Sequence, residues 1–169
     1  MSDAHGRVSA LYDTYRDSIY RFLVAQGLNP AVAQEVTQDV FVDLFVALQK
    51  GTEMNSERAW LYAVAARAAV DHWRRERPAM WSELDANGST AANVASGERS
   101  PEKQAEHTER VSKVAAGMQR LSRERRLCLQ LRMQGLRYRE IAKILHISTS
   151  TAAEWLISAV DRLRGEANG

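Results

Sequence analysis

A stretch of small, polar residues without helical periodicity, residues 79–101, divides this chain into two parts. Apolar residues recur at helical spacing on both sides of it, and only nine glycines and three prolines interrupt 169 residues. Because 45% of the residues are apolar, each part can bury a core of its own. We therefore predict an all-α fold of two small helical domains, residues 1–78 and 103–169, joined by a flexible linker at residues 79–102.

Apolar spacing and helix-breaking residues indicate where the helices lie. Gly27 and Pro30 separate a first helix from a second that ends near Gly51, and Pro78 ends a third that begins near Ser56. In the second helix, an apolar row with a spacing of four residues is expected to face the core. After the linker, four further helices are expected, of which the third spans residues 138–145 and the last ends near Leu163.

Residues 136–163 have a helix-turn-helix pattern. Ile141, Ala142 and Leu145 place apolar groups on one face of a short helix, and the small Ala142 allows a second helix to cross closely. The second helix of such a pair can enter the major groove of DNA. His146 stands in the tight turn, where it is accommodated if its backbone avoids the left-handed region.

Charge is unevenly distributed along the chain. Residues 1–60 contain five basic and eight acidic residues, whereas residues 119–164 contain ten basic and four acidic residues. An acidic front and a basic back suggest two partners of different charge. The basic excess coincides with the helix-turn-helix pattern, and several arginines there are suited to phosphate contacts: Arg123, Arg125, Arg126, Arg132, Arg137 and Arg139.

Several classes of protein lack support in this sequence. It has no phosphate-binding glycine loop and no nucleophile elbow, so we expect no enzymatic activity and no cofactor. One cysteine, Cys128, and four scattered histidines fit neither a disulfide framework nor a metal site. No apolar run is long enough to span a membrane and no secretion signal precedes the first helix, so we expect a cytoplasmic protein without a membrane partner.

Four segments resemble bacterial sigma factors. Residues 121–131 (LSRERRLCLQL) and 135–145 (GLRYREIAKIL) are similar to the C-terminal domain of these proteins. Residues 36–41 (VTQDVF) and 60–75 (WLYAVAARAAVDHWRR) are similar to their N-terminal domain. The order and separation of the motifs resemble those of the extracytoplasmic-function (ECF) group of the sigma-70 family, and the resemblance covers about residues 8–78 and 103–164.

The resemblance implies that the chain binds core RNA polymerase and promoter DNA to direct transcription initiation. The second helix would dock on the clamp coiled coil of the largest polymerase subunit through Glu35, Gln38, Asp39, Phe41 and Asp43. The third helix would capture the −10 promoter strand as it melts, through Arg67, His72, Trp73, Arg74, Arg75 and Arg77. The last two helices would contact the −35 element through Arg137, Arg139, Thr149, Ser150, Thr151, Ala153, Glu154, Trp155 and Ser158.

This sequence departs from the family pattern at both ends. Glu154 and Trp155 occupy outer positions of the last helix, where the family usually has basic or polar residues. The stretch entering the second helix keeps one carboxylate, Glu35, where the family has an acidic run, and Thr37 follows two residues later. A phosphate on Thr37 would restore negative charge. We therefore expect control by an anti-sigma factor or by a Ser/Thr kinase that acts near Thr37.

Two other interpretations remain open from the sequence. The chain could be a stand-alone helix-turn-helix regulator with an N-terminal sensing or dimerisation domain, or a polymerase-binding decoy that no longer reads promoters. The basic, aromatic-rich end of the third helix, residues 73–77, argues against a simple sensor.

Overall fold

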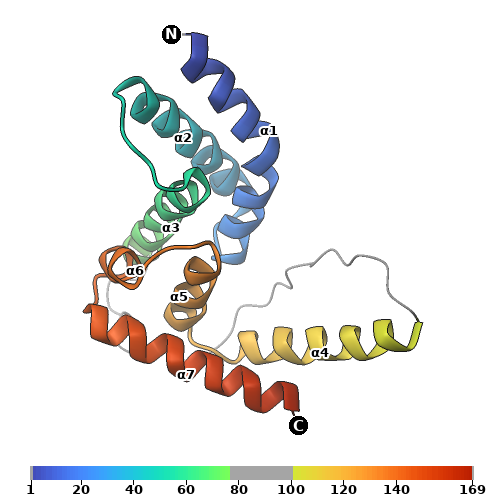
Figure 1. Ribbon diagram of the computed structural model, residues 1–169. Coiled ribbons are helices and arrows are strands. Elements are labelled where there is room, and N and C mark those ends of the chain that lie inside the picture. The colour runs from blue at the N-terminus through green and yellow to red at the C-terminus, as the bar shows by residue number, and fades with distance from the viewer. Residues whose placement is uncertain (1, 77–100, 169) are drawn as a thin grey trace.

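The computed structural model describes residues 2–76 and 101–168, and all the regular secondary structure in these ranges is helical (Figure 1). The elements are α1 (Ser2–Ala25), α2 (Pro30–Gln49), α3 (Glu57–Glu76), α4 (Pro101–Gln119), α5 (Arg123–Met133), α6 (Tyr138–Leu145) and α7 (Thr149–Asn168). The prediction of an all-α chain is confirmed. Most of the predicted linker lies outside the described residues.

Helices α1, α2 and α3 pack against one another and form an N-terminal bundle. The turn between α1 and α2 needs Gly27, whose φ of 92° lies in the left-handed region. Asn29 then caps α2, since its side-chain oxygen accepts a hydrogen bond of 2.9 Å from the Val32 N–H, and Pro30 follows at the first helical position. The fully buried side chains of this core include Ile19, Leu23, Val40, Leu44 and Leu61.

The predicted apolar row of α2 faces the core: Val40 and Leu44 are buried, and Val32, Val36 and Leu48 pack partly buried against it. The residues of α2 in the core are Ala33, Thr37, Val40, Phe41 and Leu44. A step of four residues overruns one helical turn by about 40°, so the ends of this row are less buried than its middle. Phe41, beside this row, is also buried, and its ring meets the Tyr12 ring edge to face at a centroid distance of 5.0 Å.

Helices α4 to α7 form a C-terminal bundle in which α7 contacts α4, α5 and α6. Helix α6 has the predicted bounds, whereas α7 continues to Asn168, beyond the predicted end at Leu163. The Ser148 hydroxyl accepts a hydrogen bond of 3.0 Å from the Thr151 N–H and caps α7. Cys128 is buried in this bundle, and burial raises the pKa of its thiol to about 11.

The turn between α6 and α7 corrects the expectation for His146. Its backbone has φ 56° and ψ 42°, which is the left-handed conformation that the prediction excluded. This conformation ends α6 by letting the Ile147 N–H reach the Ala142 carbonyl oxygen at 3.0 Å. Histidine tolerates the left-handed region better than most residues, although the conformation is still strained.

The two bundles contact each other along α3, which lies against α5 and α6 (Figure 1). Within the described ranges, no helix is both long enough and apolar enough to cross a lipid bilayer.

The His146 turn yields a stability prediction. Replacing His146 with Gly is expected to raise the free energy of unfolding by about 0.5–1 kcal/mol, because glycine adopts positive φ without a Cβ clash but loses more backbone entropy on folding. Urea unfolding followed by circular dichroism measures the change. As a control, Gly135→Ala at φ 95° should lower stability by about 1–2 kcal/mol. A His146→Gly variant less stable than the wild type would contradict the assigned turn.

Candidate nucleic-acid interface

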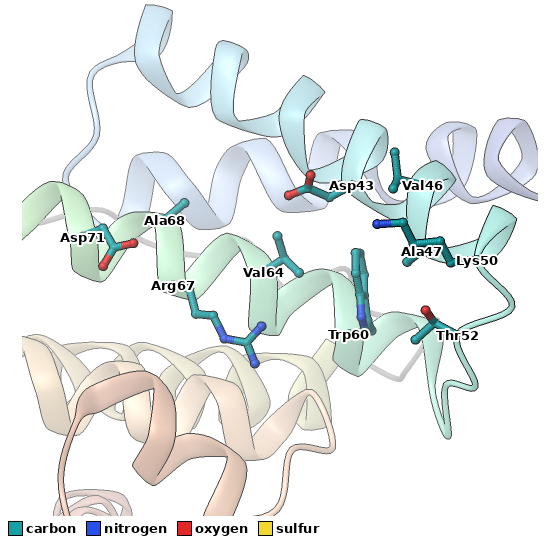
Figure 2. A pocket seen from close by; sticks show the side chains of 10 residues that line it. All are labelled: Asp43, Val46, Ala47, Lys50, Thr52, Trp60, Val64, Arg67, Ala68 and Asp71. Atoms are coloured by element: carbon teal, nitrogen blue, oxygen red, sulfur yellow. The ribbon is translucent and has the colours of Figure 1, made fainter.

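An open groove of about 610 Å³ lies between α2 and α3 (Figure 2). From α3 come residues at helical spacing, namely Trp60, Val64, Arg67, Ala68 and Asp71. The opposite wall consists of Asp43, Val46, Ala47, Lys50 and Thr52, which lie on the second half of α2 and just after it. Small side chains in both walls leave the groove open, so it extends along the helix that the sequence assigns to the −10 strand.

The groove lining combines the groups that bind unstacked nucleotides. The Trp60 ring is half-buried between α3 and the end of α2, where a base could stack on it. Lys50 and Arg67 supply cations for the backbone phosphates. Asp43 and Asp71 can accept hydrogen bonds from the exocyclic amino groups of bases, although they repel phosphate. The lining is therefore suited to a single strand whose phosphates lie close to the cations.

Sequence reasoning found only part of this groove. Arg67 was predicted to bind DNA and is exposed on the groove wall, whereas Trp60, Lys50 and Thr52 were not among the predicted DNA-binding residues. The spacing of Trp60, Val64, Arg67 and Asp71 on one helical face was the available signal. The opposite wall depends on how α2 crosses α3, which the sequence does not give.

The end of α3 is more enclosed than predicted. Trp73 is 6% exposed, and its indole N–H donates a hydrogen bond of 2.7 Å to the Gln26 carbonyl oxygen. This corrects the assignment of Trp73 to DNA, because its ring fills the core in this arrangement. His72 is half-buried and its Nε2 lies 3.3 Å from a Glu76 carboxylate oxygen. Arg75 is exposed, Arg74 is half-buried, and Arg77 lies outside the described residues.

The helix-turn-helix presents most of its predicted residues to solvent. Arg137, Arg139, Thr149, Ser150 and Glu154 are exposed, and Ala153, Trp155 and Ser158 are half-buried. Thr151 is half-buried, and its hydroxyl lies 2.8 Å from the Ser148 hydroxyl. Ile157, which was not among the predicted DNA-binding residues, is 62% exposed one turn beyond Glu154. The exposed face of α7 thus carries an acidic and an apolar residue.

Two arginines expected at phosphates bind backbone carbonyl groups instead. Arg126 donates hydrogen bonds to the carbonyl oxygens of Met118, Gln119 and Leu121 at 3.0–3.1 Å. Burial lowers the pKa of Arg126, and the charge of Arg123 adds to this effect. Arg132 donates to the Leu136 carbonyl oxygen at 3.1 Å. These side chains hold the end of α4 and the turn after α5.

The outer face of α2 carries four of the five predicted polymerase-binding residues. Glu35, Gln38, Asp39 and Asp43 are exposed, whereas Phe41 is 4% exposed and therefore leaves this set. Two exposed apolar residues that were not predicted, Val42 and Val46, lie on the same face. We call this acidic and apolar surface the α2 outer face; its residues are Glu35, Gln38, Asp39, Val42, Asp43 and Val46.

Comparison with known proteins matches each bundle to part of one family. The family model described as Sigma-70 region 2 matches residues 11–79, and that described as Sigma-70, region 4 matches residues 113–162. The chain belongs to the sigma-70 family, within its ECF group. It is therefore a sigma factor, a regulator of transcription, and its two regions imply core RNA polymerase and promoter DNA as partners. The region 2 match disfavours the alternative of a stand-alone regulator.

Curated relatives match along most of the chain. The ECF RNA polymerase sigma factor SigX of Bacillus subtilis is 26% identical over 83% of this chain and 73% of its own length. SigM of the same organism is 26% identical over 93% of each chain. BldN of Streptomyces coelicolor is 27% identical over 85% of this chain and 53% of its own length. A solved structure of an RsbN–BldN complex aligns with 93% of this sigma factor and 88% of its own chain, at 19% identity and a TM-score of 0.35.

The two classes of arginine should respond differently to substitution. Arg137→Ala and Arg139→Ala should each weaken duplex binding for all sequences alike and lower the salt-dependence slope by about one, because each removes an exposed phosphate contact. Arg126→Ala should instead lower the free energy of unfolding by about 1–2 kcal/mol, because three carbonyl groups lose a charged donor. Fluorescence anisotropy at several salt concentrations and urea unfolding measure the two effects.

Each variant is the control for the other. A change in sequence preference with unchanged overall affinity in Arg137→Ala or Arg139→Ala would show that these residues contact bases instead. Unchanged stability in Arg126→Ala would contradict its structural role.

Proposed function

We propose that this sigma factor docks on the clamp coiled coil of the largest polymerase subunit, captures the −10 strand in the α2–α3 groove and contacts the −35 element with α7. The observation that carries the proposal is the groove itself, which combines an aromatic ring, two cations and base-accepting carboxylates between two helices of region 2. Run-off transcription by core polymerase reconstituted with the chain tests it. Transcripts from a defined start site support it, and their absence excludes it.

The groove fits strand capture better than duplex binding. Melted bases need a π-face to replace lost stacking, and their phosphates need cations. Trp60 offers the first and Lys50 and Arg67 the second, on one continuous surface. Asp71 favours bases with an exocyclic amino group, adenine, cytosine or guanine, over thymine, which has none. We infer that the −10 element includes at least one such base.

The residues of the α2 outer face support polymerase docking, although this face carries little negative charge. Glu35, Asp39 and Asp43 are spaced four residues apart and exposed, and Val42 is 59% exposed between them. Carboxylates around an exposed apolar residue suit a basic surface with an apolar centre. The buried Phe41 supports this face from inside, through its contact with Tyr12.

The outer face of α7 supports a contact with the −35 element in which few residues reach the bases. Glu154 can accept a hydrogen bond from the N4 amino group of cytosine, and Trp155 can contact a thymine methyl group. Arg137 and Arg139 lie outside α7, at the start of α6, and are placed to hold the backbone while α7 reads the bases.

Control by an anti-sigma protein fits the described surface better than control by a kinase at Thr37. Thr37 is 6% exposed, and its hydroxyl donates a hydrogen bond of 2.7 Å to the Ala33 carbonyl oxygen. A kinase would need this part of α2 to open before it could reach the hydroxyl. An inhibitor protein needs only the exposed α2 outer face, which it would cover in competition with polymerase.

Trp60→Ala is expected to lower run-off transcription about tenfold or more, since stacking of one base on an aromatic ring contributes about 1–3 kcal/mol. Recovery of the variant with core polymerase should stay at the wild-type level, because Trp60 lies outside the α2 outer face. Trp60→Phe, which keeps a smaller ring, should retain most activity. A promoter with a preformed mismatch bubble at −10 should restore part of the loss.

The bubble template separates strand capture from folding. A Trp60→Ala variant that melts with the wild-type temperature and transcribes intact and bubble templates at the wild-type rate would exclude the groove as the capture site.

Substitution of Thr37 tests the kinase alternative directly. Thr37→Ala should recover core polymerase at the wild-type level, because it removes only one hydrogen bond within the helix. Thr37→Glu should lower the free energy of unfolding by about 2–3 kcal/mol, because it places a carboxylate in the core. Pull-down with core polymerase and urea unfolding measure both. Higher polymerase recovery by Thr37→Glu at unchanged stability would favour gating by phosphorylation.

A further inference from the structure

The side of α7 that faces away from the bundle is acidic and apolar, although this is the helix that enters the DNA groove under the proposed function. Ala152, Leu156 and Ala159 are buried and define the side of α7 that faces the core. Glu154 lies two positions from both Ala152 and Leu156, a rotation of about 200°, so it lies on the opposite side. We call the exposed row on that side the α7 crest; its residues are Ser150, Glu154, Ile157 and Asp161.

Ile157 is the apolar residue of the crest. It is 62% exposed and is not among the residues that pack against the core. Trp155, by contrast, is half-buried and packs against the core, and it lies about 100° around the helix from Glu154. Ile157 is therefore the apolar group of α7 that is best placed to contact a partner in front of the crest.

The Glu154 carboxylate is not neutralised by the rest of the chain. It is exposed, and within residues 2–76 and 101–168 its side chain takes part in no ion pair or hydrogen bond. Phosphates of a duplex repel such a group. Glu154 therefore lowers the affinity of α7 for most DNA sequences and favours those that offer it a hydrogen-bond donor on a base edge.

Cytosine is the base whose major-groove edge suits a carboxylate. It presents the N4 amino group as a donor and no acceptor beside it. Adenine also has an amino group, but the neighbouring N7 is an acceptor and repels a carboxylate. Guanine and thymine present only acceptors as hydrogen-bonding groups in the major groove. Glu154 thus selects cytosine against the other three bases.

Ile157 is placed to contact the base pair next to this cytosine. It follows Glu154 by three residues, an advance of about 4.5 Å along the helix, which is close to the rise of about 3.4 Å for one base pair. Its side chain has no hydrogen-bonding group and suits the C5-methyl group of thymine. A 5-methylcytosine carries the same methyl group at the same ring position. The crest therefore combines an amino-group reader with a methyl-group reader.

Exposed cations of the preceding helix can hold the duplex in register for this contact. Arg137 and Arg139 lie at the start of α6, and Lys143 lies one turn after Arg139. All three are exposed, whereas the crest itself contains no cation. Phosphate contacts fix the position of a protein on DNA without reading its sequence, so the reading falls to the crest.

We propose that the −35 contact of this sigma factor reads the methylation state of cytosine. Glu154 needs the amino hydrogen of cytosine that points into the major groove. N4-methylation replaces this hydrogen with a methyl group, because the other amino hydrogen stays paired with guanine. Ile157 instead gains a contact where a C5-methyl group, of thymine or of 5-methylcytosine, stands beside that cytosine. The inference rests on the proposed function, which places α7 at the −35 element.

The first test measures base preference with core polymerase reconstituted with the chain and templates randomised across the −35 element. The wild type should enrich cytosine at one position about tenfold. Glu154→Gln should change that preference to adenine, because an amide both accepts from N6 and donates to N7. Glu106→Gln, the same change at an exposed residue of α4, is the matched control and should keep the preference for cytosine. An unchanged preference in Glu154→Gln would overturn the role of Glu154.

The second test changes single groups in the template that the wild type selects. N4-methylcytosine at the selected position should lower transcription by the wild type about tenfold, whereas Glu154→Ala should transcribe both templates equally. Uracil in place of the neighbouring thymine removes one methyl group and should weaken template binding about fourfold for the wild type but not for Ile157→Ala. Val114→Ala, at an exposed apolar residue of α4, should keep the methyl effect. Fluorescence anisotropy of the labelled templates measures binding.

The methyl readout and the proposed function fail separately. Run-off transcripts from a defined start site with the wild type test the proposed function. If such transcripts appear and neither modified base changes transcription or binding by the wild type, the methyl readout alone is excluded. A crest that binds a protein instead of DNA would leave the −35 preference unchanged in Glu154→Gln and Ile157→Ala, which also overturns the proposal. Both side chains are exposed, so the variants should melt at the wild-type temperature.

Discussion

The structure depends on one helix, α3, which packs into the N-terminal core, lines the groove and contacts the C-terminal bundle. One side of it packs Leu61, Ala65 and Ala69 into the N-terminal core, and another lines the open groove. Its two ends hold the C-terminal bundle through Arg58 and Trp73. The alanine-rich sequence of α3 makes this feasible, since small side chains let neighbouring helices approach without filling the groove. A bulky residue at Ala68 would close the groove, and one at Ala65 would overpack the core.

The C-terminal half contains more basic residues than are available to bind DNA. Ten basic residues lie between residues 119 and 164, yet Arg126 and Arg132 bind carbonyl groups and Arg123 covers Trp73. Charge-assisted bonds to the carbonyl groups at helix ends stabilise the fold and leave less of each guanidinium for phosphate. A sequence count cannot separate the two uses, because both favour arginine near helix termini. The exposed cations left for the DNA backbone include Arg137 and Arg139 at the start of α6 and Lys143 within it.

Much of the fold follows from local signals, whereas burial and contacts between helices do not. Gly27, Pro30 and Gly135 mark helix ends through their own backbone preferences, so the sequence predicts the bounds of α2 and α6 well. The apolar row of α2 was predicted correctly, whereas the family resemblance placed Phe41 among the polymerase-binding residues although its side chain is buried. His146 was misjudged because the hydrogen bond that ends α6 outweighs the strain at a single residue.

Neither the groove nor the hydrogen bonds between the two bundles could be predicted from the sequence, and the reason is the same for both. Each consists of residues from helices that meet only after packing, and the pairs Gln26–Gln130 and Arg58–Gln134 are separated by more than seventy positions. Their chemistry nevertheless fits a regulated transcription subunit. The hydrogen bonds that join the bundles exchange readily with water, so each contributes only about 1–2 kcal/mol to the contact.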